Sequence, residues 1–144
     1  MGKRRRSRES ALQVLYQLDI MKQDGRKAMT KWMENFSSSE GKDEFAEQIV
    51  LGVLEHGREI DRLIERYSEN WRLHRMNIVD RNILRMATFE LLYCNKIPPK
   101  VTINEAIDLG KRYGSEDSGS FINGILDRLQ KEAIRKPTPA AKAH

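Results

Sequence analysis

The sequence predicts an all-α fold of six to seven helices packed around one buried central helix. Three observations lead to this prediction. Residues 78–94 contain no Gly or Pro and carry apolar side chains on nearly every side of a helical projection, which is typical of a helix buried within a bundle. The segments around it have one apolar face at helical spacing. No segment has the pattern of a β-strand.

Each helix is delimited by local signals. Asn77 is placed to cap the central helix. Thr102 and Glu105 have the spacing of a capping box and predict a helix start at Thr102. Trp71 and Leu73 are expected to lie covered beneath the connection before the central helix. The expected helices cover about residues 7–23, 28–36, 43–67 with a bend at Gly57, 78–94, 102–113, and a last one that begins between 116 and 120.

Two titratable side chains fall on predicted apolar faces. Glu90 lies on the crowded side of the central helix, and an unpaired buried charge is costly. We therefore expect Glu90 to be paired, although the sequence does not identify the partner. His56 lies on the apolar stripe of the 43–67 segment, and we interpret it as a core histidine rather than a ligand. Tyr113 is expected to point inward.

The net charge of +5 is concentrated at the N-terminus. Residues 1–8 contain five basic side chains and no acidic one, so the remaining residues are electrically balanced. This distribution predicts a neutral globule with a basic arm, and such arms bind polyanions. A solvated tail is the alternative interpretation.

Some polar and aromatic residues lie away from the core faces. Tyr16 is on the same side of the first helix as Arg5, Arg6 and Gln13. It is expected either to pack against a neighbouring helix or to stack on an unpaired base. Arg81 and Arg85 form a polar strip on the central helix. Phe121 lies about a quarter turn from the apolar stripe of the last helix.

No catalytic or metal-binding motif is present in the sequence. Cys94 is the one cysteine, which excludes an internal disulfide and fits a reducing cytoplasm. There is no phosphate-binding loop, metal-ligand pattern or elbow serine. We therefore predict no enzyme activity, no cofactor and no metal. No apolar run is long enough to cross a membrane, and acidic residues after the arginines argue against a secretory signal or a mitochondrial presequence.

Four blocks of sequence resemble the NusB family of bacterial transcription antitermination factors. They appear in order between about residues 4 and 130 and consist of Arg4-Arg5-Arg6-Ser7-Arg8-Glu9 with Leu15-Tyr16, Val79-Asp80-Arg81-Asn82-Ile83-Leu84-Arg85 with Phe89-Glu90-Leu91, Pro98 with Val101-Thr102-Ile103-Asn104-Glu105-Ala106, and Phe121-Ile122-Asn123-Gly124-Ile125-Leu126-Asp127. Gly110 and Pro99 depart from the usual family pattern.

The resemblance implies a single RNA-binding domain built of two packed helical bundles, which we place at residues 1–136 with the basic arm at 1–8. The composition of residues 137–144 predicts a disordered tail. It implies binding of single-stranded boxA RNA in ribosomal RNA leaders, together with the small-subunit ribosomal protein NusE. Other Nus factors and RNA polymerase would be engaged indirectly, and a homodimer is possible in the family. The RNA-binding residues carried over by the resemblance are Arg4, Arg5, Arg6, Arg8, Gln13, Tyr16, Tyr67, Arg81, Arg85, Asp117, Ser118 and Phe121.

Three other interpretations remain open. The domain resembles one that precedes some rRNA methyltransferases, although the chain ends at His144, which leaves no room for a methyl-donor domain. Residues 113–126 could form a helix-turn-helix that binds duplex DNA, although they contain several acids. The chain could also be a protein-interaction bundle whose basic arm is only a tail.

Overall fold

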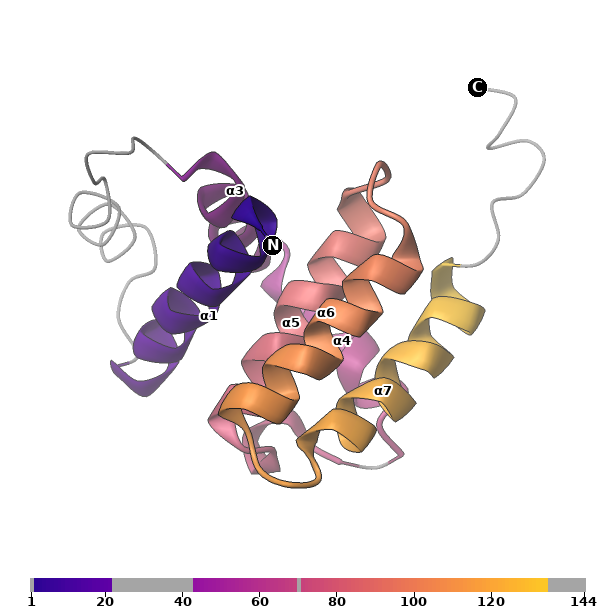
Figure 1. Cartoon of the computed structure of the whole chain (residues 1–144). Helices are drawn as coiled ribbons and strands as arrows, with labels where there is room; N and C mark the ends of the chain where they lie inside the picture. The colour runs from indigo at the N-terminus through magenta and orange to yellow at the C-terminus, as the bar shows by residue number, and fades with distance from the viewer. Residues whose placement is uncertain (1, 22–42, 70, 135–144) are drawn as a thin grey trace, which may run out of the picture.

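The computed structural model describes residues 2–21, 43–69 and 71–134, and every regular element in these ranges is helical (Figure 1). The all-α prediction is therefore confirmed for the described residues. The elements are α1 (Lys3–Met21), α3 (Glu44–Glu55), α4 (Gly57–Arg66), the 3-10 helix η1 (Leu73–Arg75), α5 (Ile78–Tyr93), α6 (Pro99–Tyr113), α7 (Ser118–Leu129) and the short π-helix η2 (Gln130–Ile134).

Helix α5 forms the centre of the fold, as its sequence predicts. It packs against α1 and α3 on one side and against α6 and α7 on the other, with α4 behind it in the view of Figure 1. Ile83, Leu84 and Met86 are at most 2% exposed. The Asn77 side chain accepts a hydrogen bond from the Asp80 N–H at 2.9 Å, which confirms Asn77 as the N-cap.

A glycine permits α3 to approach the central helix closely. A Cβ on Gly52 would overlap the ring of Phe89, and both residues are buried. The space that a side chain at position 52 would occupy is therefore filled by the Phe89 ring of α5. This contact lets α3 pack closely against α5.

Three predicted helix boundaries differ from the structure. The 43–67 segment is two helices, because His56 leaves helical geometry (φ −106°, ψ 23°) and caps α3. Helix α6 begins at Pro99 rather than at Thr102, since a proline is tolerated in the first helical turn, where N–H groups have no helical partner. Helix α1 begins at Lys3, so the basic residues form its first turns rather than a separate arm.

Three predictions of burial were also wrong. The side chain of His56 is 33% exposed and stacks on the ring of Tyr93, with 4.2 Å between ring centroids. Trp71 is 50% exposed, whereas Leu73 is buried as expected. Tyr113 is 48% exposed, and its hydroxyl donates to a carboxylate of α1. His56 and Tyr113 lie at helix ends and Trp71 lies in the connection between α4 and η1. At these positions the apolar periodicity of a helix does not determine burial.

The predictions for the helix 28–36 and the tail 137–144 fall outside the described residues. In the part of the chain that is described, no helix combines the length and apolar character that a membrane span requires.

Candidate nucleic-acid interface

Arg8 is the partner of Glu90. The Arg8 guanidinium donates two hydrogen bonds to the Glu90 carboxylate, at 2.9 and 2.8 Å, and both side chains are at most 5% exposed. The Thr102 hydroxyl donates to the same carboxylate at 2.9 Å. Burial alone would lower the pKa of Arg8, but the bonds to Glu90 outweigh it and raise that pKa. Arg8 therefore joins α1 to α5 and α6, and its predicted contact with RNA is not available in this structure.

The other three arginines of the run differ in their contacts. Arg5 donates to both oxygens of Glu105, at 3.2 and 3.0 Å, and lies 3.5 Å from Asp108. Thr102 and Glu105 thus make tertiary contacts instead of a capping box. Arg4 and Arg6 are exposed, and among the described residues neither has an ion pair. The Arg4 guanidinium lies over the Phe45 ring, 5.2 Å from its centroid.

An open depression of about 600 Å³ lies between the start of α1 and α6. Glu9 of α1 reaches the end of α6 here, where its carboxylate forms an ion pair with Arg112 at 2.7 Å and accepts a hydrogen bond from the Tyr113 hydroxyl at 3.1 Å. Arg112 is a cation on this face that sequence reasoning did not select. Its position depends on the packing of α6 against α1, which no local pattern encodes. The depression is lined by Gly2, Arg5, Arg6, Glu9, Asp108 and Arg112.

Gln13 and Tyr16 follow Glu9 along the same side of α1, since residues three and four apart share one face of a helix. The structure leaves Gln13 exposed and Tyr16 partly exposed. Tyr16 is therefore neither fully covered nor freely projecting. Its stacking role therefore stays a prediction.

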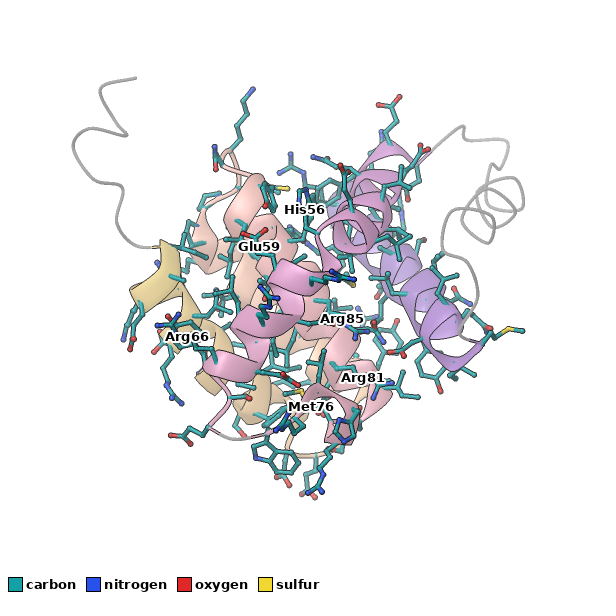
Figure 2. All side chains as sticks on the ribbon, turned by 180° about the vertical axis from the view of Figure 1, so that it is seen from behind. His56, Glu59, Arg66, Met76, Arg81 and Arg85 are labelled. Atoms are coloured by element: carbon teal, nitrogen blue, oxygen red, sulfur yellow. The ribbon has the colours of Figure 1, made fainter. Side chains whose placement is uncertain are left out.

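Arg81 and Arg85 connect helices rather than forming a free cationic strip. Arg81 donates to both oxygens of Asp19, at 2.8 and 2.9 Å. Arg85 bonds to Asp19 at 3.1 Å and to Asp61 at 2.9 Å. Figure 2 shows Arg85, with Arg81 below it, between α4 and α1. Both side chains are at most 20% exposed, so any contact with a phosphate must compete with these carboxylates.

The ion-pair network changes the titration of Asp19. Burial would raise the pKa of this carboxyl group, but the hydrogen bonds from Arg81 and Asn82 and the charge of Arg85 lower it to about 2. Asp19 therefore remains ionised at any pH at which the protein is normally handled. It lies near the end of α1 and holds that end against α5.

Of the remaining predicted site residues, Asp117, Ser118 and Phe121 are at or near the start of α7, whereas Tyr67 caps the end of α4. Asp117 is exposed and Phe121 is partly exposed. Ser118 is fully buried, and its hydroxyl accepts from the Ser115 N–H at 2.8 Å. Tyr67 is only 8% exposed. The predictions of direct RNA contact by Ser118 and Tyr67 therefore do not fit this structure, because both side chains pack inward at helix junctions.

The predicted residues thus fall into three groups. Those that reach the surface without an ion pair among the described residues are Arg4, Arg6, Gln13, Tyr16, Asp117 and Phe121. Those held by carboxylates at the surface or partly below it are Arg5, Arg81 and Arg85. Those that are buried are Arg8, Tyr67 and Ser118.

Comparison with known proteins decides the family. A family model described as the NusB family matches residues 5–131. The chain belongs to the NusB family. A curated NusB relative, the transcription antitermination protein NusB of Desulfitobacterium hafniense, is 50% identical over 135 residues, which cover 92% of this chain and 91% of that protein.

Solved NusB structures have the same fold. T. maritima NusB superposes with a TM-score of 0.83 at 42% identity, covering 92% of this chain and 94% of that one. A chain from a crystal structure of the antitermination factors NusB and NusE in complex with dsRNA has a TM-score of 0.78 at 29% identity, covering 89% and 96%. The NusB family is thus one of transcription antitermination proteins, which are regulators and not enzymes.

Proposed function

We propose that this NusB-family protein binds single-stranded boxA RNA in ribosomal RNA leader transcripts together with NusE, and that this complex helps RNA polymerase resist termination. The observation that carries the proposal is the arrangement of α1. Arg4 and Arg6, which are exposed and form no ion pair with any other described residue, lie at its start. Gln13 is exposed and Tyr16 is partly exposed further along the same helix. A solved relative, which contains NusB and NusE in complex with dsRNA, supports NusE and RNA as classes of partner.

The exposed residues divide the recognition into two parts. Arg4 and Arg6 attract phosphates, which gives salt-sensitive affinity without sequence information. The rings of Tyr16 and Phe121 stack on unpaired bases. Gln13 and Asp117 can hydrogen-bond to base edges, and the Asp117 carboxylate accepts only from a base amino or imino group. Unstacked, single-stranded RNA offers all of these groups at once.

Two of the sequence-based alternatives fit the structure less well. For duplex DNA, α7 would have to serve as the recognition helix. Arg128 is the one basic residue within α7, and its guanidinium forms an ion pair with Glu69 at 3.2 Å. This helix therefore offers no free cation to a DNA backbone. A protein-only module would not explain why the unpaired arginines and the accessible rings share α1 and the start of α7.

Binding of labelled RNA, followed by fluorescence anisotropy with and without NusE, tests the proposal. We expect a boxA-like single strand to bind more tightly than a scrambled strand of the same composition, and NusE to tighten that binding. Equal affinity for the scrambled strand would contradict sequence recognition. Preference for duplex DNA would favour the alternative function. Sedimentation of the free protein at the same concentrations would show whether a homodimer competes with RNA.

The structure also determines how the basic run should be tested. Deleting residues 1–8 would remove the first turns of α1 together with the buried Arg8–Glu90 pair. A loss of RNA binding after such a deletion would therefore be explained by unfolding alone. Point substitution of Arg4 and Arg6 avoids this, because both are exposed and unpaired in the described part of the chain.

A further inference from the structure

Trp71 and Phe121 form an aromatic pair at the surface. Their ring centroids are 5.8 Å apart and the rings meet at 73°, an edge-to-face arrangement. Trp71 is 50% exposed and Phe121 is partly exposed. In such an arrangement one ring contributes only its edge to the contact, so neither of its faces is occupied by the other ring. A large aromatic surface therefore remains accessible beside the start of α7.

The turn that carries Trp71 is fixed by hydrogen bonds. The Trp71 N–H donates to the Ser68 carbonyl at 3.2 Å, and the buried Ser68 hydroxyl donates to the Trp71 carbonyl at 2.8 Å. Two residues further, the Leu73 N–H donates to the Glu65 carboxylate at 2.8 Å. Hydrogen bonds thus hold the backbone of Trp71 itself, which reduces the entropy lost when a ligand stacks on its indole.

The surroundings of the pair suit a polyanion. Arg72 and Arg75 are exposed, and in the described ranges neither forms an ion pair. The Arg81 guanidinium, which pairs with Asp19 of α1, also lies within 3.5 Å of the carbonyls of His74 and Met76. The connection between α4 and α5 lies at the same end of the bundle as the α6–α7 turn (Figure 1). Asp117, which is proposed to bind a base edge, is exposed in that turn.

We infer that Trp71, paired with Phe121, is a stacking site for an unpaired RNA base, with Arg72 and Arg75 attracting the adjoining phosphates. The site extends the RNA-binding surface onto the α4–α5 connection. It places an exposed ring four residues after Tyr67, which the resemblance assigned to RNA binding but which is buried. The inference rests on the proposed function, because it requires the same single-stranded RNA to cross α1 and reach α7.

Trp71 provides its own spectroscopic probe. The chain has two tryptophans, so Trp32→Phe leaves Trp71 as the one indole. Titrating this variant with a labelled boxA-like RNA allows anisotropy to report binding while indole emission reports stacking. We expect emission to be quenched with the same midpoint as the anisotropy change. Titration with NusE alone, without RNA, is expected to leave the emission unchanged.

Substitution gives the second readout. Trp71→Ala is expected to weaken RNA binding by about 5- to 150-fold, the range for one lost base stack, and Trp71→Phe to weaken it less, since a ring remains. Tyr93→Ala is the matched control, because Tyr93 is also an exposed aromatic, at 42%, but lies at the far end of α5. The Tyr93→Ala variant is expected to bind RNA with the same affinity as the wild type.

The possible failures are distinguishable. Anisotropy that shows RNA binding while Trp71 emission stays constant would overturn the stacking site and leave the proposed function intact. Unchanged affinity of folded Trp71→Ala would do the same. Quenching by NusE alone would make this surface a protein contact and overturn the inference. Absence of RNA binding by the wild-type protein, with and without NusE, would overturn the proposed function itself.

Discussion

Arg6 and Arg8 are two residues apart in one basic run, yet the fold uses them in opposite ways. Arg8 is 4% exposed and bonded to Glu90, whereas Arg6 is exposed and has no ion pair among the described residues. Residues two positions apart on an α-helix point in directions about 200° apart, so a continuous run must place some members inward. A basic run in a sequence is therefore not a functional unit once it becomes helical.

The same contrast separates Arg81 and Arg85 from the start of α1. These two arginines are ion-paired with Asp19 and Asp61 and join α5 to α1 and α4. Arg4 and Arg6 join no helices by ion pairs within the described structure. We expect loss of the paired arginines to lower stability and loss of the unpaired ones to lower RNA affinity. Five predictions test this division and the role of Tyr16 on the same helix.

The largest effect is expected from Arg8→Ala. It leaves the Glu90 carboxylate buried and uncompensated, which should lower the free energy of unfolding by about 3–5 kcal/mol. Urea unfolding followed by circular dichroism measures this loss. Arg6→Ala is the matched control and should change stability by no more than about 0.5 kcal/mol. Equal effects of the two substitutions would contradict the division.

A double substitution sharpens that result. Replacing both Arg8 and Glu90 by Met removes the buried charges together, and such replacements are often neutral or stabilising. We expect the double variant to be more stable than Arg8→Ala. If it is instead less stable, the Thr102 hydroxyl bond to Glu90, rather than the ion pair, is the important contact.

Asp19→Asn should lower stability by about 2 kcal/mol at neutral pH. The pKa of this carboxyl is about 2 in the folded protein against a reference of 3.8, and each unit corresponds to about 1.4 kcal/mol. Because the folded pKa is depressed, the stabilisation is complete above pH 4–5 and is lost as pH falls toward 2. Urea unfolding at several pH values should show the gap between wild type and variant closing over this range. A gap independent of pH would show that Asp19 does not act through its charge.

Tyr16→Ala should weaken RNA binding by about 1–2 kcal/mol, the lower part of the range for a lost stack, because Tyr16 is only partly exposed. Anisotropy with a boxA-like RNA measures the change. Tyr16→Phe keeps the ring and should bind nearly as well as the wild type. If Tyr16→Ala loses stability but no affinity, the packing interpretation of Tyr16 is correct.

The smallest change in free energy is expected from replacing Arg4 and Arg6 together by Ala. The slope of log affinity against log salt should flatten by about 1.4, at about 0.7 for each phosphate contact with a single strand. Arg58→Ala with Arg62→Ala is the matched control, since both are exposed on α4, behind α5 in the view of Figure 1. An unchanged slope in the first pair would remove the start of α1 from the RNA-binding surface.

Local rules were sufficient for much of the fold. The all-round apolar pattern of residues 78–94 identified α5 as the central helix, and Asn77 was correctly expected to cap it. The sequence also indicated that Glu90 needs a partner, because its position on the apolar side of the helix predicts burial and an unpaired buried carboxylate is costly. The residues of the candidate site were found less completely. Arg112 and Trp71 were missed as surface groups, and Tyr67 and Ser118 were expected at the surface although they are buried.

The sequence by itself determined that this protein is a helical bundle around α5, and that its excess positive charge lies at the N-terminus of the chain. Only the tertiary structure decided that Arg8 is the partner of Glu90, that Asp19 holds Arg81 and Arg85, and that Trp71 meets Phe121. The physical reason is one of range. Periodicity and capping depend on neighbours within about four residues along a helix, whereas these contacts join residues 50 or more positions apart, which only the packing of the helices brings together.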